Sequence, residues 1–259
     1  MRKEVLFKNN LNQKLVGDLY LPKNINKPPV IIVMHGYQGG RKGIARLAAD
    51  FALKKGFAVL AFDRSGHGES QGDYSQYTVS QGANDLKSSV NFLLNNNQVD
   101  INRIGLMATS GSAYEAIIYS SQNNNHLKSL VLSVPVTNYK KIGAGHPEFL
   151  PENLNKWQDK GVIRGEDKNF PGLKYKFVED FEKYNLFNLA KKINIPTLVH
   201  YAEKDSIISE AKKDSKILYK NLSAQEKNIF GTPTDHGYHK TDLREDIFER
   251  FFRWFKKYL

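Results

Sequence analysis

Three residue types that together can activate a hydroxyl group occur along this chain in the order serine, aspartate, histidine. Ser110 lies in the small-residue stretch ATSGS, Asp205 follows IPTLVHYAEK, and His236 lies in GTPTDHGYHK. A serine hydroxyl is a weak nucleophile until a base accepts its proton, and the histidine that does so needs an acid to hold its tautomer. The three stretches therefore predict nucleophilic acyl chemistry at Ser110.

Small flanking residues identify the nucleophile within ATSGS. The usual pattern G-x-S-x-G is not met, because Ala108 and Ser112 occupy the two glycine positions. Centring the turn on Ser110 leaves small residues on both sides, whereas centring it on Ser112 puts the bulky Tyr114 where strand and helix pack closely. We expect Ser110 to be the nucleophile and Ser112 a spacer, whose hydroxyl either crowds the following helix or forms a local hydrogen bond.

The acid and the base each have a competitor nearby in the sequence. Asp205 ends a strand pattern, whereas Glu203 and Lys204 are expected to point to solvent as turn residues. His236 lies in a loop close to the last strand, whereas His239 is expected in the first turn of a helix, facing solvent. We therefore predict Asp205 and His236 as the partners of Ser110, an order that matches one of the three known for serine hydrolases.

A developing oxyanion needs two hydrogen-bond donors, and two loops can supply them. The Gly111 amide follows the nucleophile, and the Tyr37 amide lies in HGYQGG, the glycine-rich loop after a buried strand. His35 opens this loop and is expected to form structural hydrogen bonds. We predict the amides of Tyr37 and Gly111 as the oxyanion hole.

The loop FDRSGHGESQG resembles a phosphate-binding loop but lacks the Gly-Lys-Ser/Thr that would hold phosphate and metal. Its Asp63, Arg64 and His67 are expected to tie the loop together beneath the site. The seven histidines are dispersed and show no convincing metal-ligand spacing.

Apolar runs that alternate with helical patterns predict the elements that position these residues. Such alternation is typical of a mainly parallel sheet with helices on both faces, whose ligands bind at the carboxyl ends of the strands. Strands are predicted at Glu4–Lys8, Lys14–Leu21, Pro28–Gly36, Phe57–Asp63, Ile104–Ala108, Leu127–Val134, Pro196–Tyr201 and Lys227–Phe230. Helices are predicted at Ile44–Lys54, from near Thr78, from Ser112 to about Ser121, at Ile208–Leu222, and at the end of the chain, with Leu243, Ile247, Phe251, Trp254 and Tyr258 on one face.

The interval 137–183 interrupts this alternation. It is charged and turn-rich and too long for an ordinary connection, yet its aromatic residues, Trp157, Phe170, Tyr175 and Phe177, argue against disorder. We expect a small insertion over the carboxyl end of the sheet, acting as a lid or, alternatively, as a surface decoration.

Composition restricts the partners and the location. The 259 residues are 40% hydrophobic and 25% charged, as in ordinary soluble proteins, and no apolar run approaches the roughly 18 residues of a membrane helix. The N-terminal residues show no secretory signal, and there is no cysteine. The net charge of +11 comes from scattered lysines rather than a basic run. We therefore expect a cytoplasmic protein without nucleic-acid or membrane partners.

The chain resembles the α/β-hydrolase superfamily of serine hydrolases. The resemblance is carried by HGYQGG, DRSGHGES, the Ser110 turn, the EKD turn and DHG. More narrowly, it is similar to compact feruloyl (cinnamoyl) esterase-like and acylaminoacyl-peptidase-like hydrolases. The resemblance implies an α/β-hydrolase fold with a mostly parallel eight-stranded sheet and helices on both faces. It also implies a core domain of residues 1–136 and 184–259, with a lid or cap of residues 137–183 between strands six and seven.

The same resemblance implies a Ser110–Asp205–His236 triad, an oxyanion hole at Tyr37 and Gly111, and no cofactor. The expected reaction is hydrolysis of small-molecule carboxylic esters of small or medium acyl groups through an acyl-enzyme. Thioesterase, acyltransferase or peptidase-type chemistry with the same triad remains the alternative, and a non-catalytic binding protein is less expected. A homodimer remains open, as do the natural substrate and any lid movement.

Overall fold

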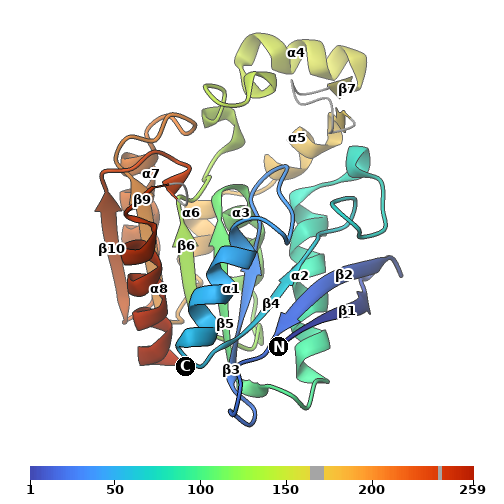
Figure 1. Ribbon diagram of the computed structural model, residues 1–259. Helices are drawn as coiled ribbons and strands as arrows, with labels where there is room; N and C mark the ends of the chain where they lie inside the picture. Colours follow the sequence, from blue (N-terminus) through green and yellow to red (C-terminus); the bar gives the residue numbers. More distant parts are fainter. Residues whose placement is uncertain (164–171, 239–240) are drawn as a thin grey trace.

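An eight-stranded sheet forms the centre of the molecule (Figure 1), in a computed structural model that describes residues 1–163, 172–238 and 241–259. The strand order is β1-β2-β4-β3-β5-β6-β9-β10. Strands β1 and β2 run antiparallel to their neighbours and the remaining strands pair in parallel, which confirms the predicted fold class. The strands are β1 (Arg2–Lys8), β2 (Lys14–Tyr20), β3 (Pro29–Met34), β4 (Ala58–Phe62), β5 (Asp100–Thr109), β6 (Leu127–Ser133), β9 (Thr197–Ala202) and β10 (Lys227–Thr232).

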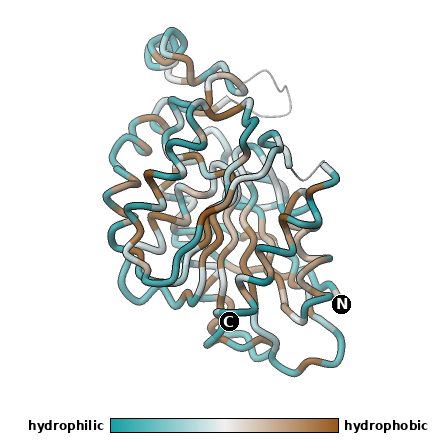
Figure 2. The backbone as a smooth tube through the Cα atoms, turned by 90° about the vertical axis from the view of Figure 1, so that its left-hand side faces the viewer, coloured by the Kyte–Doolittle hydropathy of each residue, from teal (hydrophilic) through white to brown (hydrophobic). Residues whose placement is uncertain are grey.

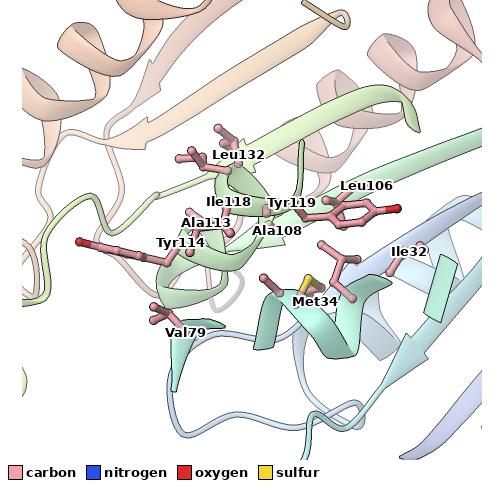
Figure 3. Close-up of a cluster of buried hydrophobic side chains, with 14 of the residues drawn as sticks. Ile32, Met34, Val79, Leu106, Ala108, Ala113, Tyr114, Ile118, Tyr119 and Leu132 are labelled. Atoms are coloured by element: carbon pink, nitrogen blue, oxygen red, sulfur yellow. The ribbon is translucent and has the colours of Figure 1, made fainter. Parts of the chain in front are cut away.

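Helices cover both faces of the sheet and bury two separate apolar clusters against it. Helices α1 (Ile44–Lys54) and α8 (Arg244–Tyr258) pack on one face, and α2 (Val79–Leu94) and α3 (Ala113–Ser120) on the other. Figure 3 shows part of the second cluster, in which α3 lies over side chains of β3, β5 and β6. Brown apolar strands at the centre and teal segments outside show the same layering in Figure 2. Helix α7 (Ala211–Asn221) packs against β9 and β10, and the short helix α6 (Leu186–Ala190) packs against α3 and α7.

Two helices differ from the sequence prediction. Helix α7 begins at Ala211 rather than Ile208, because Glu210 takes a left-handed conformation with φ of 62°. The buried face of α8 consists of Ile247, Phe248, Phe251, Phe252 and Phe255. The predicted face was therefore wrong in part: Leu243 is exposed, and Trp254 and Tyr258 are only partly buried. The helix carries aromatic residues on more than one side, and the sheet covers the side with four phenylalanines.

The segment between β6 and β9 lies beyond the carboxyl ends of the strands (Figure 1). Its described part contains α4 (Pro151–Lys160), α5 (Lys176–Phe181), a short hairpin of β7 (Val162–Ile163) and β8 (Leu173–Lys174), and 3-10 turns at Tyr139–Lys141 and Pro147–Phe149. Fully buried aromatic rings join this segment to the core, among them Tyr139, Phe149, Trp157 and Phe177. Phe170 lies outside the described residues. The domain limits and the role as a lid stay predictions.

No helix in the described part of the chain is long and apolar enough to cross a membrane.

Candidate active site

Ser110 occupies a sharp turn between β5 and α3. Its φ of 56° lies in the left-handed region, which costs energy for a residue with a side chain and is characteristic of functional turns. The backbone of the glycine-rich loop lies against it, since a methyl group on Gly36 would be 3.1 Å from Ser110 Cβ. The strand–turn–helix arrangement predicted from ATSGS is therefore present.

Ser112 forms local hydrogen bonds within this turn. Its side chain is fully buried, and its Oγ accepts a hydrogen bond from the Thr109 amide at 2.9 Å. The carbonyl oxygens of Thr109, at 2.9 Å, and Met34, at 3.3 Å, are the acceptors available to its single proton. Of the two expectations for Ser112, local hydrogen bonding rather than crowding is the one that the structure supports.

Ser110, His236 and Asp205 form a continuous chain of hydrogen bonds. His236 Nε2 lies 2.9 Å from Ser110 Oγ, and His236 Nδ1 lies 2.8 Å from Asp205 Oδ2. With the proton on Nδ1 donated to the carboxylate, Nε2 is free to accept the serine proton. The other carboxylate oxygen, Asp205 Oδ1, accepts from the amides of Ile207 and Ile208, at 2.9 and 2.8 Å. These bonds hold the carboxylate in place.

Asp235 joins the two loops that carry Asp205 and His236, and sequence reasoning did not single it out. Its Oδ1 accepts from the His236 amide at 2.6 Å and from the amide and hydroxyl of Ser206 at 3.0 and 2.7 Å. The hydrogen bonds from Ser206, more than any other contact, lower the pKa of Asp235. The acid next to His236 was visible in the sequence, but its partner 29 residues away was not.

The competing residues lie as follows. Glu203 and Lys204 are exposed, as expected for turn residues. His239 lies outside the described residues. His35 is buried next to the carbonyl oxygen of Gly36, which supports its structural role. Burial, and secondarily the charge of Arg64, lower the pKa of His35 well below its ordinary value, so its ring is neutral.

The amides of Tyr37 and Gly111 come together beside Ser110. A methyl group on Gly111 would lie 3.1 Å from Tyr37 N and 2.7 Å from Tyr139 Oη, so this position accepts only glycine without rearrangement. Among the described residues neither amide has a hydrogen-bond acceptor. Both N–H groups are thus free to bind a ligand oxygen. The Tyr37 phenol is directed to Glu148 at 3.4 Å.

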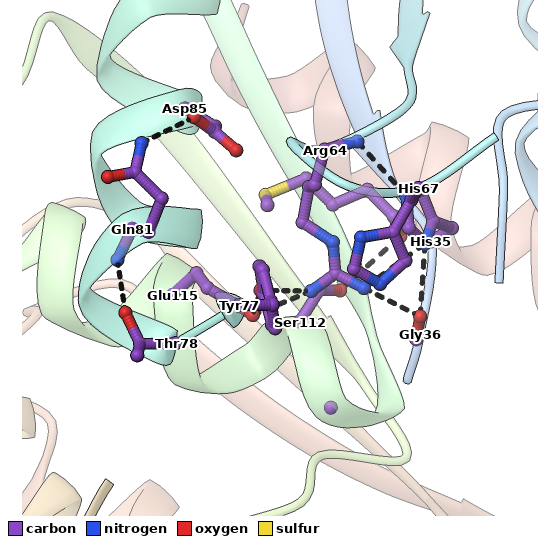
Figure 4. A network of polar contacts seen from close by, with 12 residues as sticks. His35, Gly36, Arg64, His67, Tyr77, Thr78, Gln81, Asp85, Ser112 and Glu115 are labelled. Atoms are coloured by element: carbon purple, nitrogen blue, oxygen red, sulfur yellow. Dashed lines mark hydrogen bonds and ion pairs between the residues drawn. The ribbon is translucent and has the colours of Figure 1, made fainter. Parts of the chain in front are cut away.

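The DRSGHGES loop is tied together beneath the site, as predicted. Asp63 accepts from the Arg41 amide at 2.7 Å and pairs with its guanidinium. His67 Nδ1 lies 3.1 Å from Ser65 O, and burial lowers the pKa of His67 to about 3. Arg64 reaches further, to residues of the nucleophile helix and the glycine-rich loop (Figure 4).

A pocket of about 230 Å³ opens over Ser110 and His236. Its apolar lining comes from both the core and the segment after β6: Tyr37, Ile44, Val136, Ile142 and Ile207. A larger groove of about 620 Å³ along α7 includes Asp205 but not Ser110, so we place the candidate site in the smaller pocket, where the reactive atoms lie. Within the described residues, no three histidine, aspartate or glutamate side chains are grouped to hold a metal ion.

Comparison with known proteins relates this geometry to a family. A 31.7 kDa protein from the traX-finO intergenic region of Escherichia coli is 25% identical over 289 residues, covering 97% of this chain and 98% of that protein. The esterase Pf2001 of Pyrococcus furiosus superposes with a TM-score of 0.76 and 25% identity, over 100% of this chain and 93% of that chain. Est1E of Butyrivibrio proteoclasticus, in a structure with ferulic acid bound, has a TM-score of 0.79 and 19% identity, over 96% and 98% of the two chains.

The family model described as serine aminopeptidase, S33, matches residues 26–169. This range includes the glycine-rich loop, the DRSGHGES loop and the Ser110 turn, and it spans more than half of the chain. The chain therefore belongs to the serine aminopeptidase S33 family and is an α/β-hydrolase.

Proposed function

We propose that this protein is a serine hydrolase that cleaves carboxylic esters of small or medium acyl groups. The observation that carries the proposal is the hydrogen-bonded chain from Ser110 Oγ through His236 to Asp205, on a strained turn that opens into the pocket. The esterase Pf2001, which is similar over the whole length of this chain, supports an ester as the substrate class.

The proposed first half-reaction forms an acyl-enzyme. Ser110 Oγ attacks the ester carbonyl carbon while its proton passes to His236 Nε2 over the 2.9 Å hydrogen bond. Asp205 stabilises the resulting imidazolium through Nδ1–H. The tetrahedral intermediate then collapses, the C–O bond to the alcohol breaks, and the alcohol leaves with the proton from Nε2.

The second half-reaction repeats these steps with water. His236 Nε2 accepts a proton from water, whose oxygen attacks the acyl carbon, and Ser110 leaves with its proton restored. In both halves the amides of Tyr37 and Gly111 hold the negative oxygen. Removing one such donor from a serine hydrolase lowers kcat by about 10²–10³-fold, so this pair supplies a large share of the proposed rate enhancement.

The pocket supports a short acyl chain. Its volume of about 230 Å³ is below the range of about 300–1,000 Å³ typical of drug-sized ligands, and its walls are largely aliphatic. We expect p-nitrophenyl acetate and butyrate to be better substrates than long-chain esters. Because Est1E shares the fold and its structure holds ferulic acid, the substrate series should also include a cinnamoyl ester.

Ser110→Ala tests the assignment of the nucleophile. Turnover of p-nitrophenyl butyrate should fall to the background level, and a fluorophosphonate probe should label the wild type but not this variant. Ser120→Ala, which removes a buried hydroxyl on α3, is the matched control and should keep its labelling. Undiminished turnover by Ser110→Ala would refute the proposal.

Product analysis distinguishes ester hydrolysis from other acyl chemistry of the same triad. Incubation with matched oxygen esters and thioesters, an aminoacyl amide, and added alcohol acceptors would show which bond is cleaved and whether water or an alcohol takes the acyl group. Faster thioester cleavage, amide cleavage or predominant acyl transfer would replace the esterase assignment. Failure of the probe to label Ser110 would indicate a binding protein instead. Light scattering of the purified protein would test for a homodimer.

A further inference from the structure

The two amides proposed to hold the oxyanion belong to peptide groups whose carbonyl oxygens have different partners. The carbonyl oxygen of Ser110 accepts only from neutral amides, those of Val136 at 3.1 Å and Ala113, among the described residues. The carbonyl oxygen of Gly36 accepts from the Gly39 amide at 3.1 Å and, at shorter range, from the guanidinium of Arg64, whose Nη2 lies 2.7 Å away. In a trans peptide the C=O and N–H bonds point in opposite directions, so the donors that hold Gly36 O also set where the Tyr37 N–H points, and the guanidinium is the charged one among them.

Arg64 is itself held rigidly, from the helix that follows the nucleophile. Its Nη1 donates to Glu115 Oε1 at 2.6 Å and to Tyr77 Oη at 2.8 Å, and Glu115 lies in the first turn of α3. Both charged side chains are at most 1% exposed. As Figure 4 shows, the guanidinium thus connects the helix after Ser110 with the loop that carries Tyr37.

The cation that acts on Gly36 O is the guanidinium. His35 Nδ1 also lies 3.0 Å from this oxygen, but its ring is neutral, because burial and the charge of Arg64 lower its pKa. A positive charge at a carbonyl oxygen draws electrons from the peptide group and makes its N–H a stronger donor, as in other polarised hydrogen-bond chains.

Stability alone is a weak reason for this buried ion pair. Taking a guanidinium and a carboxylate out of water costs several kcal/mol per ion, and apolar residues of similar size often stabilise such a site equally well. The pair lies behind one of the two proposed oxyanion donors. A role in the reaction is therefore a second reason for the pair to be present.

We infer that Arg64 is a positioning residue, whose guanidinium orients and polarises the Gly36–Tyr37 peptide so that the Tyr37 N–H becomes the stronger of the two oxyanion donors. This inference rests on the proposed function. Losing one donor outright costs about 10²–10³-fold in kcat, and polarisation adds about 10–30% to a hydrogen bond. Loss of orientation and polarisation together should therefore lower kcat by roughly 10- to 100-fold.

Three variants separate this role from a structural one. Arg64→Gln removes the charge and leaves Glu115 buried with the Tyr77 hydroxyl but without its cationic partner, so it should lose both stability and kcat. The double variant Arg64→Met/Glu115→Met removes both charges, so it should regain most of the stability without regaining kcat. Arg64→Lys keeps a cation, but its single nitrogen cannot reproduce both the Nη1 bond to Glu115 and the Nη2 bond to Gly36 O, so it should fold and still lose kcat.

The matched control is Arg41→Gln. Arg41 is also 1% exposed and paired with carboxylates, but no hydrogen bond joins it to Gly36 within the described residues. Fluorophosphonate titration counts the active sites of each variant, so kcat is expressed per folded enzyme. Arg41→Gln should be less stable but keep kcat per site within about threefold of the wild type.

A transition-state analogue gives the most direct readout. A trifluoromethyl ketone forms an oxyanion with the serine, whereas the corresponding carbinol does not. In the Arg64 variants the Ki of the ketone should rise by the same factor as kcat falls, while the Ki of the carbinol and KM change little.

Two results would overturn the inference: kcat per site in the double variant or in Arg64→Lys within about threefold of the wild type, or equal losses in Arg64→Gln and Arg41→Gln. An inactive, unlabelled wild type would instead refute the proposed function. The two failures are therefore distinguishable.

Discussion

Replacing Ser112 by alanine tests the hydrogen bonds that hold the nucleophile turn. The hydroxyl is fully buried and accepts from the amide of Thr109, the last residue of β5, directly before Ser110. Alanine keeps nearly the same volume but leaves this amide without its acceptor. The substitution therefore isolates the hydrogen bond from packing.

The expected loss of stability follows from the burial of that amide. A buried donor left unsatisfied costs about 1–3 kcal/mol. For a chain of this size each kcal/mol lowers Tm by roughly 2–4 °C, so Ser112→Ala should unfold roughly 2–12 °C below the wild type. Because Thr109 directly precedes the nucleophile, the lower Tm should be accompanied by a modest fall in kcat per active site, counted by fluorophosphonate titration.

Ser120→Ala is the matched control for this measurement. Both serines are buried: Ser112 directly precedes α3, and Ser120 is the last residue of that helix. Unlike Ser112 Oγ, Ser120 Oγ has no hydrogen-bond partner among the described residues. Removing an unsatisfied hydroxyl should leave Tm unchanged or raise it slightly. Thermal and urea unfolding of the wild type and both variants, followed by circular dichroism, compares the two changes directly.

The reasoning fails if Ser112→Ala and Ser120→Ala shift Tm equally. Ser112→Gly restores the glycine of the usual pattern and also removes the acceptor, so it should be at least as destabilising as alanine. If Ser112→Gly were instead more stable than the wild type, the hydroxyl would be crowding the turn rather than bonding within it.

Three further predictions concern acid stability and the loops of the site. Burial lowers the pKa of His67 and His200 to about 3, below the value of about 6.5 in unfolded chains, so each ring stays neutral in the fold while the unfolded chain takes up a proton. Their contribution to stability is present above about pH 6.5 and lost as the pH falls, by about 2 kcal/mol per ring from about pH 7 to about pH 5. Urea unfolding of the wild type and His200→Gln at both values checks this, and equal pH dependence of the two would contradict it. Asp235→Ala should lower kcat by roughly 10-fold with little change in KM, because it releases His236 from the Ser206 loop; steady-state kinetics showing a changed KM alone would be inconsistent with that role. Gly111→Ala should lower kcat by about 10²-fold or more, since its methyl group would lie 2.7 Å from Tyr139 Oη and 3.1 Å from Tyr37 N, and trifluoromethyl ketone binding should weaken in parallel; retained affinity for the ketone would exclude an oxyanion hole at Gly111.

Local patterns were enough to predict much of the fold and the three residues of the hydrogen-bonded chain. Short apolar runs mark buried strands, and the residues directly after them lie at one edge of a parallel sheet. Ser110 and Asp205 follow such runs, and His236 lies a few residues after another. The face of α8 that packs on the sheet was not predictable from the sequence. Apolar residues lie on more than one side of that helix, and which side is buried depends on how the helix packs against the sheet.

The sequence by itself determined which side chains could carry the chemistry and which strand ends present them, because both depend on residue type and on periodicities within a few residues. Only the tertiary structure decided how those side chains are held. Asp235 meets Ser206 across 29 residues, and Arg64 meets Glu115 across 51. Such pairings depend on how distant loops pack against each other, and a buried charge has no periodicity that reveals its partner. The identity of the candidate site was therefore local information, whereas its orientation and polarisation arise from long-range contacts.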